Sequence, residues 1–115
     1  MAKTHPHHSI SYIEFNVPSV ETARAFYGKV FGWSFVDYGP DYISFSGPTV
    51  NGGFTTGTAG SPGVLVVLYS AALEKTRDAI AAAGGSITKD IFDFPGGRRF
   101  EFLDPCGNTL AVWSE

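Results

Sequence analysis

The sequence predicts an α+β fold built from two copies of one plan: a strand, a helix and then further strands. Strand patterns open the two copies at residues 10–17 and 64–69. A helical pattern follows each, and the two patterns begin 53 residues apart, at Val20 and Leu73. The glycines that close the helices, Gly32 and Gly85, are also 53 apart. Two such modules side by side would build a curved sheet with a concave face, where a ligand can lie.

The first strand and helix carry the clearest patterns. Residues 10–17 alternate, so one face is apolar and packs under a helix, while the other is mixed, as a cavity lining would be. Ser19 is a suitable N-cap for the helical run from Val20 to Phe31, and Gly32 is placed to end that helix in a left-handed conformation. Residues 1–8 are polar and contain Pro6 and three histidines, and we expect them to form a flexible arm.

The remaining elements follow in the order that alternation and turn residues dictate. The expected segments are strands at 33–38 and 42–45 around a turn at 39–41, a strand containing residues 52–54, a small-residue linker at 55–63, the strand at 64–69, a helix from Leu73, a strand at 86–91, a loop at 92–97, and a closing hairpin of 98–103 and 109–114 around 104–108.

Composition narrows the function classes. The chain has 115 residues, the length of one domain. Its net charge is −3 and its eight Lys and Arg are scattered, which argues against nucleic acid as a partner. No apolar run approaches the ~20 residues that span a membrane, so we expect no membrane partner. The single cysteine, Cys106, cannot form an internal disulfide, and a cytoplasmic location is the default expectation.

Two motifs resemble one protein family. Residues 26–33, FYGKVFGW, resemble the end of the first helix in the vicinal oxygen chelate superfamily, which includes glyoxalase I, bleomycin-resistance proteins and extradiol dioxygenases. Residues 102–108, FLDPCGN, resemble the DP-x-GN turn of that superfamily. The resemblance is greatest to small bacterial glyoxalase-like members. It implies two βαβββ modules, about 9–57 and 62–115, in a single domain of residues 9–115, with a mixed sheet curled around a cavity and usually a homodimer.

The resemblance also implies where metal ligands would lie. Metal-using members commonly place two His and two Glu, or His, His and Glu, on the inner face of the sheet. Three of the matching positions here hold Tyr12, Val64 and Ala111, and the fourth falls near Ser44. A divalent metal needs three or four converging N, O or S donors. We therefore expect no metal and no other cofactor, and neither glyoxalase I nor ring-cleaving activity, although Glu14 could be a displaced ligand.

Strand alternation gives a candidate ligand site on the inner face. Its expected lining is Tyr12, Glu14, Asn16, Val64, Val66, Leu68, Ala111 and Trp113. This mostly apolar lining with a few polar points is typical of small-molecule sites. Glu14 is the candidate catalytic residue, as a general base or as an anchor for a cationic ligand. The alternative is a surface or dimer-seam Glu14, or one paired with Arg98 or Arg99.

Two further side chains are candidate ligand-binding groups. Either Arg98 or Arg99 enters the cavity if their strand is regular, and Arg99 is our candidate for holding an anionic group. Trp113 and Trp33 could stack on an aromatic or cationic ligand, although both are more readily explained as core residues.

These observations predict a metal-independent small-molecule-binding protein of the glyoxalase/bleomycin-resistance type, which sequesters an aromatic or cationic ligand in a dimer-linked cavity. Three alternatives stay open: a metal-free isomerase or lyase that uses Glu14, a metal-dependent lyase or dioxygenase with unusual ligands, and a structural or regulatory partner domain. The sequence leaves open whether the modules pair within one chain or between chains.

Overall fold

The computed structural model describes residues 5–46, 50–56 and 63–115. The chain divides into two compact units, one of residues 12–65 and the other of residues 66–115 together with residues 1–11. We name the two repeats after these units: module one begins with the strand at residues 10–16 and module two with the strand at residues 63–69, so the first residues of both strands lie across the division. Most of the predicted linker, and the first half of the predicted arm, lie outside the described residues. No helix in the described part of the chain is long and apolar enough to span a membrane.

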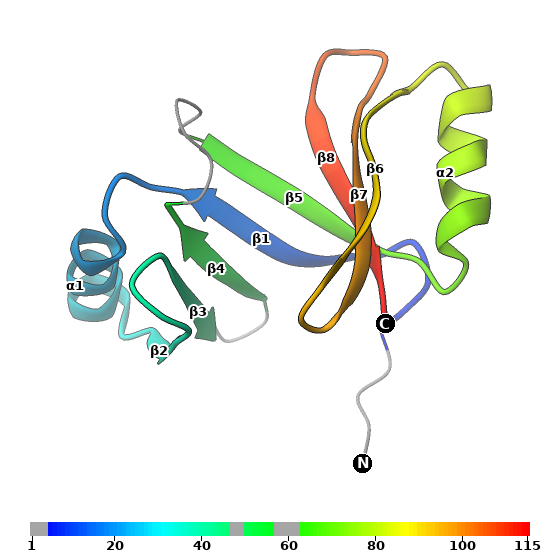
Figure 1. Cartoon of the computed structure of the whole chain (residues 1–115). Coiled ribbons are helices and arrows are strands. Elements are labelled where there is room, and N and C mark those ends of the chain that lie inside the picture. The colour runs from blue at the N-terminus through cyan, green and yellow to red at the C-terminus, as the bar shows by residue number, and fades with distance from the viewer. Residues whose placement is uncertain (1–4, 47–49, 57–62) are drawn as a thin grey trace. The chain divides into compact units, whose positions relative to one another are not determined.

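Module one follows the predicted order of strand, helix and three strands (Figure 1). Its elements are β1 (Ile10–Asn16), α1 (Val20–Phe31), β2 (Ser34–Asp37), β3 (Tyr42–Ser46) and β4 (Asn51–Thr55). The strands lie in the order β2-β3-β4-β1, where β1 and β4 are parallel and the other neighbours antiparallel. The module therefore holds a mixed sheet.

Module two repeats this topology. Its elements are β5 (Gly63–Tyr69), α2 (Leu73–Ala82), β6 (Ser86–Phe94), β7 (Gly97–Leu103) and β8 (Thr109–Ser114). The strand order β6-β7-β8-β5, with β5 and β8 parallel, matches that of module one strand for strand. The predicted α+β fold class with two βαβββ modules of mixed sheet is thus confirmed.

Helix α1 begins and ends as predicted. The Ser19 hydroxyl accepts a hydrogen bond from the Thr22 backbone N–H, and Gly32 adopts φ 71° while its N–H bonds to the Gly28 carbonyl. Helix α2 is different, because Ala72 occupies its N-cap position and makes no side-chain capping bond. The Ser70 hydroxyl accepts from the Ala72 N–H instead.

The second half departs from prediction between β6 and β7. Strand β6 continues to Phe94, and β7 begins at Gly97, so the expected loop at 92–97 is a tight hairpin turn at Pro95 and Gly96. Strand β6 reaches this length through register shifts against β7 between Ile87 and Phe92. The polar residues and bulges of β6 interrupt the alternation by which a strand is predicted. The Pro-Gly-Gly run also indicates a longer loop than the structure has.

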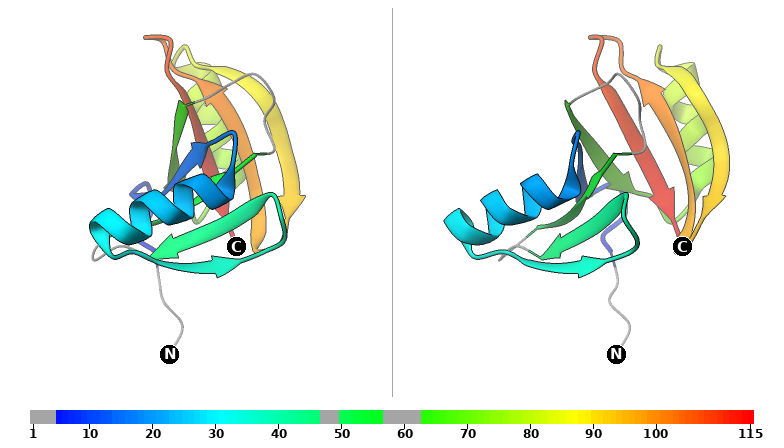
Figure 2. Two further views of the ribbon diagram at one scale, coloured as in Figure 1. Left: turned by 90° about the vertical axis from the view of Figure 1, so that its left-hand side faces the viewer. Right: turned by 60° about the vertical axis from the view of Figure 1, so that its left-hand side comes forward.

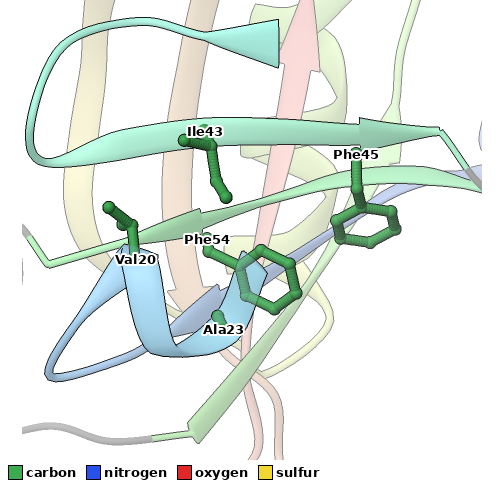
Figure 3. Close-up of a cluster of buried hydrophobic side chains, with 5 residues drawn as sticks. All are labelled: Val20, Ala23, Ile43, Phe45 and Phe54. Atoms are coloured by element: carbon green, nitrogen blue, oxygen red, sulfur yellow. The ribbon is translucent and has the colours of Figure 1, made fainter. Parts of the chain in front are cut away.

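The core of module one lies between α1 and its sheet (Figure 3). Val20 and Ala23 of α1 face Ile43, Phe45 and Phe54 of β3 and β4. Around them pack the partly buried Phe15, Val17, Tyr27, Trp33 and Phe35. The apolar face of β1 predicted from alternation is therefore the face that the helix covers.

The core of module two lies between α2 and the corresponding sheet face, and Figure 2 shows α2 lying along that sheet. Its buried members are Leu73, Phe100, Phe102 and Val112. The partly buried residues packed around them are Leu68, Ile80, Ile87, Ile91 and Leu110. Aliphatic side chains make up more of this core than of the first.

The turn between β7 and β8 explains the FLDPCGN motif. The Asp104 carboxylate accepts hydrogen bonds from the backbone N–H groups of Cys106 and Asn108, at 2.8 and 2.9 Å, and from the Asn108 side-chain amide at 3.1 Å. Donation from Asn108, chiefly from its backbone, holds the pKa of Asp104 below its ordinary value. Asp104 and Asn108 therefore fix the geometry of the closing hairpin.

Residues 5–8 of the predicted arm make specific contacts with module two. The His8 N–H donates to the Tyr69 carbonyl, and the Tyr69 N–H donates to the Ser9 carbonyl. The Ala71 N–H donates to Nδ1 of His7 at 2.9 Å, and Nε2 of His8 lies 3.0 Å from the Thr76 hydroxyl. These contacts tie the described part of the segment to β5 and α2.

Candidate functional site

The mixed face predicted for β1 lies on the side of the module-one sheet opposite α1. Phe15 packs into the core under α1, so alternation places Tyr12, Glu14 and Asn16 on the other face. All three side chains are half-buried. The grouping of these three candidates on one face therefore agrees with the sequence prediction.

A pair of tyrosines meets on this face. The hydroxyls of Tyr12 on β1 and Tyr42 on β3 are hydrogen-bonded to each other. They meet over β4, where Gly53 leaves room for them, because a Cβ at that position would collide with both hydroxyls. The sequence did not predict Tyr42 or Gly53 as site residues. Their contact with Tyr12 depends on β4 pairing with both β1 and β3, and β1 is distant from the other two strands in the sequence.

The strand register places polar groups on both sides of Gly53. Glu14 is the β1 partner of Gly53, and Ser44 is its β3 partner. In the next row on this face, Asn16 and Tyr42 flank Thr55. Phenol and hydroxyl groups both donate and accept hydrogen bonds, a carboxylate accepts, and an amide does both. The face therefore presents a compact set of hydrogen-bonding groups with one potential negative charge.

The corresponding face of module two carries different residues from those predicted. Leu68 and Val112 are strand partners and belong to the core under α2, and Val66 pairs with Leu110 beside them. The prediction that Val66 and Leu68 share a face with Ala111 and Trp113 is therefore wrong. The partners of Ala111 and Trp113 are Val67 and Tyr69. The uninterrupted apolar run of β5 gave no alternation from which to choose its faces.

Ala111 and Val64 offer no polar group to a ligand. Ala111 is fully buried, as is its strand partner Val67. Val64 lies near the start of β5 and is 56% exposed. Trp113 belongs to a ring cluster, in which its centroid lies 5.2 Å from Tyr69 and 5.1 Å from His5. Its indole N–H donates to the Ser11 hydroxyl at 2.9 Å.

The two arginines of β7 point to opposite faces, as strand alternation predicts. Arg98 forms two hydrogen bonds with Glu74 of α2, at 2.5 and 3.3 Å. The hydrogen bond from Arg98 lowers the pKa of Glu74 to about 2. Arg99 lies on the face of Trp113, forms an ion pair with Glu101 at 2.7 Å and lies over the Phe92 ring. Arg99, the candidate for an anionic ligand, thus has a carboxylate beside it.

The donor set of the described residues does not fit a divalent metal. No three His, Cys, Asp or Glu side chains gather there as a metal centre requires. Of the positions that the resemblance assigns to ligands, Tyr12 is bonded to Tyr42, Ser44 offers a hydroxyl, and Val64 and Ala111 are aliphatic.

Comparison with known proteins identifies the family. The family model described as Glyoxalase/Bleomycin resistance protein/Dioxygenase superfamily matches residues 9–112. The chain belongs to this superfamily. No curated protein matches it in sequence. The match covers both modules, so the FYGKVFGW and FLDPCGN resemblances reflect true membership of the Glyoxalase/Bleomycin resistance protein/Dioxygenase superfamily.

Solved structures share the fold of this chain at low identity. A Mn(II)-bound glyoxalase from Novosphingobium aromaticivorans aligns with a TM-score of 0.72 and 22% identity, over 94% of this chain but 39% of that one. Methylmalonyl-CoA epimerase from Mycobacterium tuberculosis aligns with a TM-score of 0.73 and 11% identity, over 99% of this chain and 92% of that one. A superfamily member from Vibrio splendidus 12B01 aligns with a TM-score of 0.70 and 14% identity, over 94% of this chain and 99% of that one. At these identities the likeness is one of fold alone.

Proposed function

We propose that this superfamily member binds a small molecule without a metal, on the face of module one formed by Tyr12, Glu14, Asn16, Tyr42, Ser44 and Thr55. We call this surface the tyrosine face. The observation that carries the proposal is the meeting of the Tyr12 and Tyr42 hydroxyls over Gly53, in the row that also holds Glu14. Convergent, half-buried polar groups are what fixes the orientation of a ligand in a small-molecule site.

The chemistry of the tyrosine face favours a cationic ligand with hydrogen-bonding groups. A carboxylate on a half-buried strand attracts a positive charge, and tyrosine rings present a negative face to cations. The hydroxyls of Tyr12 and Tyr42 can each exchange a hydrogen bond with the ligand. Sequestration of such a ligand needs no reaction, so binding alone suffices for this function.

The test is a binding screen with matched variants. We expect cationic, polyhydroxylated compounds, screened by thermal shift and titrated by calorimetry in EDTA, to stabilise the wild-type protein. Glu14→Gln and Tyr42→Phe should each weaken binding by roughly tenfold, the effect of about 1.4 kcal/mol. Glu21→Gln on α1 and Tyr38→Phe, whose side chain is 65% exposed, are the matched controls and should bind normally. Equal loss in the controls, or binding that EDTA abolishes, would contradict the proposal.

Glu14 also supports a second candidate function, a metal-free isomerase or lyase. A carboxylate can accept a proton from a substrate while a neighbouring phenol donates one, which is the pairing that general acid–base catalysis needs. The register places Glu14 beside the residue over which both phenols meet. If this function holds, Glu14→Gln would lower kcat by about 10²–10⁴-fold while binding survived. Loss of binding with no turnover in the wild type would favour sequestration.

A metal-dependent lyase or dioxygenase is the third alternative that the sequence leaves open. Elemental analysis of protein purified without chelators separates it from the other two. We expect less than stoichiometric divalent metal, and a bound ion at one per chain would overturn the metal-independent proposal.

A further inference from the structure

Module two contains an apolar groove on the α2 side of its sheet, away from the face that carries Trp113 and Arg99. Its volume is about 370 Å³. One wall is α2, through Ala79, Ile80 and the C-cap residue Ala83, and the other is the sheet, through Leu68, Phe102 and Val112. The groove is apolar except at one end, where His8 and Thr76 lie.

The internal repeat explains why this space is open. In module one, Phe15 and Phe54 are strand partners, and in module two the partners at the same place are Leu68 and Val112. Residues 15 and 68 are 53 apart, the spacing of the two helix starts, and the same spacing relates Tyr27 to Ile80. Three aromatic positions of module one are therefore aliphatic in module two.

Those three rings fill the corresponding space in module one. The ring centroids of Phe15, Tyr27 and Phe54 lie 6.0, 5.2 and 5.1 Å from one another, so the three pack as one cluster under α1. In module two all three corresponding side chains line the groove. Interiors pack closely and a missing ring leaves space that the backbone closes only in part. We therefore attribute the groove to the smaller side chains at these three positions.

The polar end of the groove is built from an ordered chain of hydrogen bonds. Nε2 of His8 lies 3.0 Å from the Thr76 hydroxyl, which lies 2.7 Å from the fully buried Ser70 hydroxyl. This chain places one hydroxyl and one imidazole beside the apolar lining of the groove. A ligand with one hydrogen-bonding group on an aromatic frame matches that distribution.

We propose that the groove under α2 is a second binding site, for a one- or two-ring aromatic molecule carrying a single hydroxyl or N–H group. The volume of about 370 Å³ falls within the range of small-molecule sites, about 300–1,000 Å³. A planar ligand in the groove would supply the ring packing that Phe15, Tyr27 and Phe54 provide in module one. The site is separate from the tyrosine face and does not depend on the function proposed for it.

The test uses 2-naphthol as the probe and methyl NMR as the readout. We expect titration with 2-naphthol to shift the methyl signals of Leu68, Ile80 and Val112. Decahydro-2-naphthol has the same carbon skeleton and hydroxyl but is not flat, and it should bind at least about tenfold more weakly. Ile80→Phe places a ring where module one has Tyr27 and should abolish the shifts at Leu68 and Val112.

Matched variants keep the test decisive. Ala79→Leu narrows the groove from α2 and should also weaken binding, in case Ile80→Phe disturbs the core. Ala81→Leu is the control, since Ala81 is exposed and outside the groove. Glu14→Gln and Tyr42→Phe should leave 2-naphthol binding unchanged. The proposal would be overturned by an absence of shifts, by equal binding of the two probes, or by methyl shifts that follow protein concentration without probe, which would indicate a second copy in the groove.

Discussion

Gly53 determines the chemistry of the tyrosine face although it contributes no side chain. The strand positions on either side of it hold Glu14 and Ser44, and the hydroxyls of Tyr12 and Tyr42 occupy the space over it. Any side chain there would push the two phenols apart. A single missing Cβ thus allows groups from three strands to meet.

Gly53→Ala tests this role. The added methyl group must displace the Tyr42 and Tyr12 hydroxyls, so we expect the protein to lose about 1–3 kcal/mol of stability through overpacking. Ligand binding on the tyrosine face should fall with it. Urea denaturation measures the stability, and calorimetry measures the binding. The control is Ser46→Ala, because Ser46 is exposed and lies on the same sheet. Gly39→Ala is unsuitable, because Gly39 has φ 101°, where any side chain would strain the backbone.

At the residue scale, the sequence predicted faces where polar and apolar residues alternate. Strand β1 alternates clearly, and the placement of Glu14 beside Tyr12 on one face agreed with that pattern. Strand β5 has no such alternation, and its assignment was wrong for Leu68. The Tyr12–Tyr42 contact could not be predicted from the sequence, because it depends on a register between strands that no local pattern encodes.

At the scale of elements, the two helices differ at the N-cap residue that precedes each of them. Ser19 caps α1 through its hydroxyl, whereas Ala72 at the start of α2 has no side chain that can do this. An orphan backbone N–H at a helix start costs stability unless a side chain or water accepts from it.

The two caps give opposite predictions. Ser19→Ala should destabilise the protein by about 1 kcal/mol, because it removes the acceptor for the Thr22 N–H. Ala72→Ser should stabilise it by about 0.5–1 kcal/mol, because it supplies an acceptor that α2 lacks. Chemical denaturation of both variants beside the wild type gives the two values. Changes of the same sign in both would contradict the capping argument.

Elements were predicted best where a terminator was explicit. Helix α1, with Ser19 before it and Gly32 after it, ended at the predicted residues. Strand β6 ran three residues past its predicted end, because its bulges break the alternation by which a strand is recognised. The groove under α2 escaped prediction for another reason: it becomes visible only when Leu68, Ile80 and Val112 are compared with their larger counterparts in the first repeat.

At the scale of the whole molecule, the Glu74–Arg98 ion pair links stability to pH. The pKa of Glu74 falls from 4.5 to about 2, chiefly through the hydrogen bond from Arg98. A depressed carboxyl pKa stabilises the folded state above the unfolded pKa, and that stabilisation is lost as the pH falls toward the folded pKa. We expect Glu74→Gln to melt below the wild type at pH 7, and the difference to shrink from about pH 4.5 to pH 2. A difference independent of pH would show that the ion pair is not its source.

The expected homodimer is a second prediction at this scale. Helix α1 exposes three large apolar side chains, those of Phe26, Val30 and Phe31, each more than half exposed. Apolar groups gathered on one helix commonly mark an interface. We expect sedimentation velocity to show a dimer, and Phe31→Lys to shift it toward monomer without loss of helical signal. Lys29→Glu, also exposed on α1, serves as the comparison variant. A wild-type monomer at all concentrations would contradict the prediction.

The attachment of residues 5–11 to module two bears on how the chain folds as it is made. The Trp113 indole donates a hydrogen bond to Ser11, and Thr76 is hydrogen-bonded to His8, so these contacts join residues 102 and 68 positions apart in the chain. Contacts so distant along the chain form late and slow the search for the native state. Ser11 therefore completes its contact only after Trp113 has been synthesised, whereas residues 12–16 of the same strand can pair with β4 as soon as module one has been made.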